Sequence, residues 1–194
     1  MSTDGVNHSR RRMLIGATAA VGAVGVVGAA VPFVKSWNPS AKAKAAGAPV
    51  TADISRLEPG QQMTVEWRGK PVWVVRRTPE ILANLKKVEG DLRDPASAES
   101  VQPENVDKHH RGIKPEILVL VGICTHLGCS PLYRPEVAPA DLGAKFLGGF
   151  FCPCHGSIYD MAGRVFQGVP APLNLEVPPY RFDSDSVITI GESA

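Results

Sequence analysis

The hydrophobic pattern begins with a long uncharged stretch near the N-terminus. No Asp, Glu, Lys or Arg occurs from Met13 to Val34, and as a helix this stretch is long enough to cross the hydrocarbon core of a bilayer. We therefore predict a membrane anchor over residues 13–34, preceded by a cytoplasmic segment over residues 1–12. Residues 35–50 are mostly small or polar, include prolines and show no apolar period, so they predict a flexible hinge linker.

From Thr51 onward the apolar runs become short and are separated by Gly and Pro. Residues 63–67 alternate in polarity, and an apolar run over 71–75 follows Arg68-Gly69, which together predict a β-hairpin. Continuous apolar residues over 117–123 predict a buried strand. Further short strands are predicted at 146–151, 156–160, 164–167, 173–177 and 187–190. Short strands separated by turns favour an all-β antiparallel sandwich or barrel over residues 51–194.

One helix is predicted within this β-rich head. Thr78 is a suitable N-cap residue and Pro79 suits the first helical position, so the helix would run from Pro79 to about Lys87. The following residues, 88–116, are polar and contain several prolines. They predict a long loop or insertion.

The charged residues argue against nucleic-acid binding and indicate the role of the N-terminal segment. The net charge of the chain is only +2, which leaves no strongly basic surface for nucleic acid. Arg10 and Arg11, followed by one further residue and then Met13-Leu14, resemble a twin-arginine export signal. The alternative is an ordinary anchor with a basic flank. Lysines and arginines are equally numerous on the two sides of the anchor, so the positive-inside rule does not orient it; the export signal places the N-terminus inside and the head outside.

The candidate chemistry lies in two short boxes that contain all four cysteines and two of the five histidines. Each box directly follows a predicted strand. The boxes are Cys124-Thr125-His126-Leu127-Gly128-Cys129 and Cys152-Pro153-Cys154-His155-Gly156-Ser157. A tetrahedral zinc site is one alternative, although this spacing differs from the usual paired cysteines of zinc modules. Two disulfides are another, although they would leave both histidines without a role.

The boxes resemble those of the Rieske family, whose pattern is Cys-x-His-x-x-Cys followed by Cys-x-Cys-His. The resemblance implies one 2Fe–2S cluster, with Cys124 and Cys152 on one iron and His126 and His155 on the other. It also implies a disulfide between Cys129 and Cys154. The implied fold is an antiparallel Rieske-type β-sandwich with a small cluster-binding subdomain, about residues 118–168, preceded by one transmembrane helix.

The ligand types explain the electronic character of such a centre. Two Fe(III) ions carry six positive charges, and two sulfides with two thiolates carry six negative charges, so neutral histidines leave the oxidised cluster uncharged. A neutral cluster accepts an electron more readily than one with four thiolates, and histidine ligation raises the potential to roughly −150 to +300 mV.

The resemblance also implies roles for residues around the cluster. Ser157 would donate its hydroxyl to a bridging sulfide, and Tyr159 would donate to a cysteine sulfur. Leu127 would cover one side of the cluster, and Gly168–Pro172 would cover another. From the residues alone, Ser157 would be a turn residue, and Tyr159 and Leu127 would be core residues.

The implied function is electron transfer in a bacterial respiratory cytochrome bc complex, a quinol–cytochrome c reductase. Ubiquinol would be oxidised against His155, and the electron would pass to cytochrome c1. The partners would be cytochrome b and cytochrome c1 in a dimeric complex, with a single-pass anchor in the inner membrane and a periplasmic head. The alternative is the Rieske subunit of a periplasmic molybdenum oxidase such as arsenite oxidase. Outside redox chemistry, a zinc-stabilised interaction module is a third hypothesis.

Overall fold

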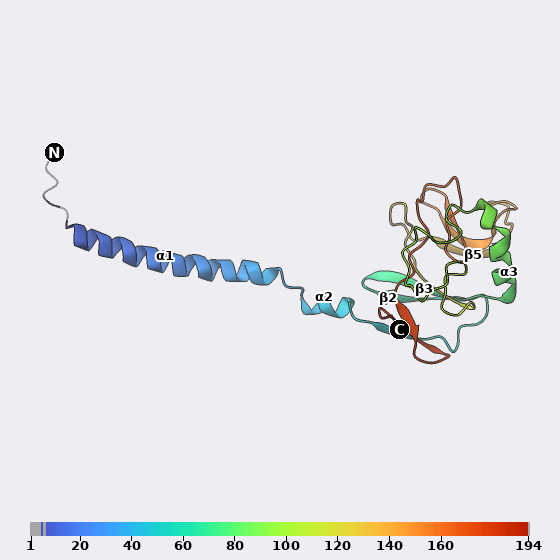
Figure 1. Cartoon of the computed structure of the whole chain (residues 1–194), viewed down its shortest axis with the longest axis horizontal. Helices are drawn as coiled ribbons and strands as arrows, with labels where there is room; N and C mark the ends of the chain where they lie inside the picture. Colours follow the sequence, from blue (N-terminus) through green and yellow to red (C-terminus); the bar gives the residue numbers. More distant parts are fainter. Residues whose placement is uncertain (1–4, 6, 194) are drawn as a thin grey trace. The chain divides into compact units, whose positions relative to one another are not determined.

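The N-terminal part of the computed structural model is one long helix (Figure 1). The structure describes residue 5 and residues 7–193. Helix α1 spans His8–Ser36, and Asn7 caps its start by accepting a hydrogen bond from the Arg10 amide at 3.1 Å. In the described part of the chain it is the one helix long and apolar enough to span a membrane. It contains the predicted anchor and begins several residues before it.

A second, short helix lies in the segment predicted to be a linker. Helix α2 spans Ala41–Ala46, where the sequence analysis predicts no regular structure. Alanine and lysine both favour helix, and Ser40 supports the helix start by accepting a hydrogen bond from the Ala43 amide at 3.1 Å. The hinge function of residues 35–50 stays a prediction.

The head is built from three antiparallel three-stranded sheets. The first, in spatial order, is β1 (Val50–Asp53), β9 (Val187–Ile190) and β8 (Tyr180–Phe182). The second is β2 (Gln62–Trp67), β3 (Lys70–Arg76) and β4 (Ile117–Val121). The third is β5 (Leu132–Val137), β6 (Leu147–Cys152) and β7 (Ser157–Asp160). The predicted all-β antiparallel class is confirmed.

The core joins the second sheet to the third. All five residues of β4 are buried. Trp73 of β3 stacks on Phe150 of β6 with ring centroids 5.0 Å apart. Directly after β4, a Cβ on Gly122 would lie 2.3 Å from the Trp73 ring, so only glycine fits there. The second candidate box starts at Cys152, the last residue of β6, and the first starts at Cys124, shortly after β4 ends at Val121.

The predicted hairpin and helix are confirmed. Strands β2 and β3 pair up to Trp67 and Lys70, and the two turn residues Arg68 and Gly69 have positive φ values of 54° and 70°, as a type I′ turn requires. Helix α3 spans Pro79–Lys87, and the Thr78 side chain caps it by accepting a hydrogen bond from the Ile81 amide at 3.2 Å. A 3₁₀ turn, η1 (Glu89–Asp91), follows.

Two predicted strands are wrong. Residues 164–167 make only isolated bridges, and residues 173–177 form no strand. Their backbone groups bond to loops and side chains instead: the Val165 amide donates to Asn174 Oδ1 at 2.8 Å, and the Val177 amide donates to the Val101 carbonyl at 3.0 Å. Strands β1, β5 and β8 were not predicted from the sequence because they are short or interrupted by polar residues.

Candidate metal centre

The two boxes form tight turns at the ends of buried strands. In the first box the Gly128 amide donates to the Cys124 carbonyl at 3.0 Å, and in the second the Gly156 amide donates to the Cys152 carbonyl at 2.9 Å. Gly128 and Gly156 adopt φ values of 82° and 78°, a conformation that favours glycine. The second box is itself the turn between β6 and β7.

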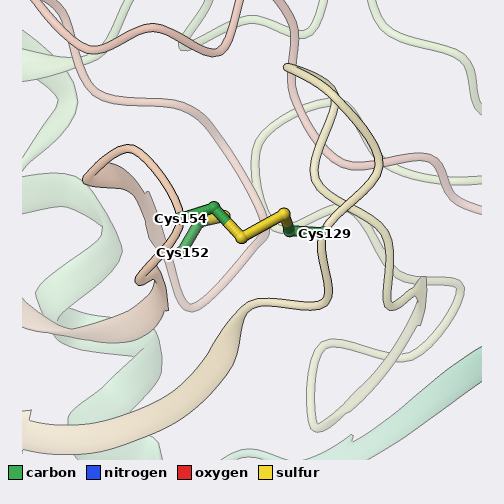
Figure 2. Close-up of side chains that lie close together, drawn as sticks. All are labelled: Cys129, Cys152 and Cys154. Atoms are coloured by element: carbon green, nitrogen blue, oxygen red, sulfur yellow. A yellow bond between two sulfur atoms is a disulfide. The ribbon is translucent and has the colours of Figure 1, made fainter.

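A disulfide ties the two turns together. Cys129 and Cys154 are bonded, although they lie 25 positions apart in the sequence, and Figure 2 shows this bond with Cys152 beside it. The predicted pairing is confirmed. The three sulfur atoms lie within 4.8 Å of one another, but bonded sulfurs offer no thiolate to a metal. Only Cys152 of this group can be a ligand.

The remaining cysteines, Cys124 and Cys152, are free and buried. Burial raises the pKa of the Cys152 thiol. A buried thiol is an inert side chain unless a metal replaces its proton, because the thiolate is the form that binds metal. Two such thiols on covalently joined turns could therefore serve as the sulfur ligands of a metal site.

Two histidines that could serve as nitrogen ligands come from the same two boxes. The rings of His126 and His155 lie edge to face, with centroids 4.7 Å apart. His126 Nδ1 is buried and has no hydrogen-bond partner among the described residues. An orphaned buried nitrogen is costly, and a metal ion in place of the missing donor would satisfy it. The donor set of two thiols and two imidazoles thus fits a 2Fe–2S cluster of the histidine-ligated kind.

A hydrogen-bond network surrounds the two thiols. The Tyr159 hydroxyl lies 3.2 Å from Cys124 Sγ and accepts a hydrogen bond from the Thr125 amide, also at 3.2 Å. Since that amide occupies the oxygen, the Tyr159 proton is free to point at Cys124 Sγ or at Thr125 Oγ1, which lies at the same distance. Burial, and then contact with Cys124, raise the pKa of Tyr159, so the phenol keeps its proton.

Ser157 and Leu127 differ in their surroundings. Ser157 is fully buried, and its Oγ accepts a hydrogen bond from the Ala171 amide at 3.1 Å. Leu127 is 71% exposed, so it lies on the outer surface of the first box.

Thr125 is a residue of the site to which the sequence pattern assigned no role. Its hydroxyl donates to the Leu173 carbonyl at 2.6 Å, and its position between two candidate ligands is the signal that could have identified it.

Comparison with known proteins decides the family. A family model described as "Rieske [2Fe-2S] domain" matches residues 48–180. The chain belongs to the Rieske family. A second model, "Ubiquitinol-cytochrome C reductase Fe-S subunit TAT signal", matches residues 1–40, the range that contains Arg10 and Arg11. The Rieske assignment explains both boxes and excludes the zinc module.

Relatives of this Rieske protein match over nearly its whole length. The ubiquinol–cytochrome c reductase iron–sulfur subunit of Allochromatium vinosum is 59% identical over 192 residues, which cover 99% of this chain and 93% of the relative. The subunit of Rhodospirillum rubrum is 46% identical over 191 residues, covering 98% and 96%. A chain of a solved structure titled "Hyperthermophilic respiratory Complex III" is 30% identical to this one. The match covers 88% of this chain and 96% of that chain, with a TM-score of 0.48.

These relatives support the bc-complex interpretation over the molybdenum-oxidase alternative. The chain belongs to the family of ubiquinol–cytochrome c reductase iron–sulfur subunits, which are electron-transfer subunits of an oxidoreductase complex with a 2Fe–2S cluster. The apolar helix together with the export-signal match fits a membrane-anchored subunit.

Proposed function

We propose that Cys124, His126, Cys152 and His155 hold the single 2Fe–2S cluster of this subunit. The observation that carries the proposal is the pairing of two free, buried thiols with two imidazoles whose centroids are 4.7 Å apart, on turns joined by one disulfide. The orphaned His126 Nδ1 supports it. When bound, the cluster supplies one-electron transfer.

The two imidazoles differ in exposure, and we assign them different roles. His155 is exposed, whereas His126 is partly buried. We assign the quinol-facing role to His155, because a ring that substrate can reach can hydrogen-bond the ubiquinol hydroxyl and take up its proton. The exposed Leu127 side chain offers apolar contact beside that ring. The electron then leaves toward cytochrome c1.

The surrounding hydroxyl groups adjust the electron affinity of the centre. Tyr159 presents a phenol to Cys124 Sγ, and Ser157 presents a buried hydroxyl at the end of the second box. Each would favour the reduced, more negative state by donating a hydrogen bond to sulfur. Because both donors are buried, water does not compete with them, and their effect on the potential is strong.

For the whole chain we propose a single-pass subunit of the bacterial inner membrane in a dimeric complex. Residues 1–12 would lie in the cytoplasm, 13–34 in the membrane, 35–50 in the hinge and 51–194 in the periplasmic head, with the cluster-binding subdomain at about 118–168. The match to an export-signal family over residues 1–40 supports this orientation, as does the length of α1.

Replacement of the proposed ligands tests the assignment. Cys124→Ala, Cys152→Ala, His126→Ala and His155→Ala should each abolish the electron paramagnetic resonance signal of the reduced cluster in isolated membranes. His109→Ala is the matched control, since it removes an exposed imidazole that belongs to neither box. A full cluster signal and unchanged iron content in any of the four variants would remove that residue from the ligand set.

A further inference from the structure

The residues after β7 form a closed loop that carries the Gly168–Pro172 segment. The two ends of this loop meet where the Leu175 amide donates to the Gly163 carbonyl at 2.8 Å. Inside it, the Val165 amide donates to the Asn174 side chain at 2.8 Å. We call residues 163–175 the proline loop. Its two ends lie close together, so one residue can hold both of them.

That residue comes from the long insertion over residues 88–116. Arg111 is fully buried. Its Nη1 donates to the carbonyls of Ala162 and Gly163 at 3.1 and 3.3 Å, and its Nη2 donates to the Leu175 carbonyl at 2.7 Å. One planar guanidinium therefore holds the start and the end of the proline loop together, which a single ammonium group would not do with the same geometry.

The placement of Arg111 is energetically costly. Its φ is 54°, a left-handed conformation that is strained for a non-glycine residue. Among the described residues no carboxylate forms an ion pair with it, and its partners besides the carbonyls are limited to Gln102, whose Oε1 accepts from Nε at 3.0 Å. Gly163 leaves the necessary room, because a Cβ there would lie 2.8 Å from Leu120 and 3.3 Å from Arg111 Nη1.

The far side of the proline loop contacts both boxes. The Ala171 amide donates to Ser157 Oγ at 3.1 Å, and the Thr125 hydroxyl donates to the Leu173 carbonyl at 2.6 Å. Among the described residues, Ala171 is the one hydrogen-bond partner of the Ser157 side chain. With an oxygen lone pair of Ser157 occupied by this amide, the hydroxyl proton of Ser157 is directed away from the proline loop, and its direction depends on where the loop lies.

We propose that Arg111 is a positioning residue that tunes the cluster through the proline loop. By holding both ends of the loop, Arg111 keeps the Ala171 amide on Ser157 Oγ, and this contact aims the Ser157 proton at the cluster. Through Arg111, the insertion over residues 88–116 thus stabilises the loop that contacts the redox site. This inference rests on the proposed cluster site and adds to it a residue from outside both boxes.

The test is Arg111→Lys, which keeps the positive charge but lacks the planar fork. The reduction potential of the cluster is measured in the intact complex by redox titration, in the wild-type and in the Ser157→Ala background. We expect Arg111→Lys to lower the potential by less than Ser157→Ala does. In the Ser157→Ala background it should have no further effect, because the route through Ser157 is already lost.

Arg77→Lys is the matched control. Arg77 is equally buried and also donates to backbone carbonyls, those of Pro115, His110 and Met161, none of which belongs to the proline loop. We expect this variant to lower stability without moving the potential. Hydrogen exchange should show faster exchange of the Ala171 and Leu175 amides in Arg111→Lys and unchanged exchange of these amides in Arg77→Lys.

The outcomes separate this inference from the proposed site. An unchanged potential in Arg111→Lys, or an equal shift in both backgrounds, would overturn the role of Arg111 while the cluster signal of the wild type still supports the ligands. Absence of a Rieske-type signal in the wild type would overturn the proposed site itself. If Arg111→Lys does not accumulate, Gln102→Met removes the Nε partner of Arg111, together with the hydrogen bonds that Gln102 Nε2 donates to the Val106 and Asp107 carbonyls at 3.2 and 3.5 Å. It should shift the potential in the same direction, and no shift there overturns the inference.

Discussion

The hydroxyl of Tyr159 lies 3.2 Å from Cys124 Sγ, and both side chains are buried. The Thr125 amide donates to the same hydroxyl oxygen, so the tyrosine proton is available to the sulfur. A proton donor at this sulfur stabilises the extra negative charge of a reduced cluster. A residue of β7 thus contacts the box that follows β4 at its cysteine sulfur.

Tyr159→Phe should lower the reduction potential. A hydrogen bond to a charged group is worth roughly 1.5–3 kcal/mol, and 59 mV corresponds to about 1.4 kcal/mol for one electron, so the largest expected drop is about 60–130 mV. Redox titration of the purified complex measures it. Tyr180→Phe is the control, since its buried hydroxyl accepts the Ile113 amide at 2.8 Å away from the boxes. An unchanged potential in Tyr159→Phe would mean that its proton does not reach the sulfur.

Removal of the disulfide should shorten the lifetime of the cluster, with less effect on the cluster spectrum. Cys129 and Cys154 are 25 residues apart, and a cross-link closing a loop of that size stabilises the folded chain by about 3–4 kcal/mol in the chain-entropy description. The double variant Cys129→Ser/Cys154→Ser should therefore unfold at a lower temperature and lose its cluster faster during incubation. Cluster lifetime equal to that of the wild type would contradict the role of the bond in holding the two turns together.

The paired arginines should be needed for export. Arg10→Lys with Arg11→Lys should leave the head on the cytoplasmic side of the membrane, protected from protease added to spheroplasts. Arg12→Lys is the matched control, because Arg12 occupies the variable position after the pair and should still allow export. Export of the double variant at the normal rate would remove the twin-arginine interpretation.

The linker over residues 35–50 should set the rate of electron delivery to cytochrome c1. Ala43→Pro with Ala45→Pro both breaks α2 and stiffens the backbone. It should slow flash-induced reduction of cytochrome c1, while the cluster spectrum stays unchanged. Ala43→Gly with Ala45→Gly breaks the helix without stiffening it and should slow delivery less. Equal rates in all three proteins would count against a moving head.

The stability of the head should fall in mild acid through His110. Burial lowers the pKa of His110; the Asp107 carboxylate at 3.4 Å opposes this, the charge of Arg77 adds to it, and the pKa stays below its usual value. The neutral imidazole is therefore favoured in the folded state, whereas the unfolded chain binds a proton near pH 6.5. The free energy of unfolding should decrease as the pH falls below about 6.5, until the folded state is also protonated. Denaturation of the full-length protein between pH 7 and 5 measures this slope.

His110→Gln removes the titrating group and should flatten that slope. Lys108→Gln is the control, because it removes a charge from the same turn and should leave the slope as it is. The proposal about His110 would be contradicted by a slope of the same size in His110→Gln.

Features encoded over a few neighbouring residues were predictable from the sequence. The anchor, the Thr78 cap, the Arg68-Gly69 turn and the two Cys–His boxes each depend on residues within a short stretch, because helix length, turn conformation and ligand spacing are local properties. The residues alone were also compatible with a zinc site or with two disulfides. The Cys129–Cys154 pairing followed from the Rieske resemblance.

Only the tertiary structure decided how the boxes are supported. Residues 164–167 and 173–177 carry strand-like apolar patterns, yet they form a loop because their backbone groups bond to Asn174 and Val101. Arg111 reaches Leu175 across 64 positions, and Thr125 reaches Leu173 across 48. Such contacts follow from how the sheets pack rather than from any nearby residue pattern. The sequence by itself therefore determined the chemistry of the centre, and the packing of distant segments decided what holds that centre in place.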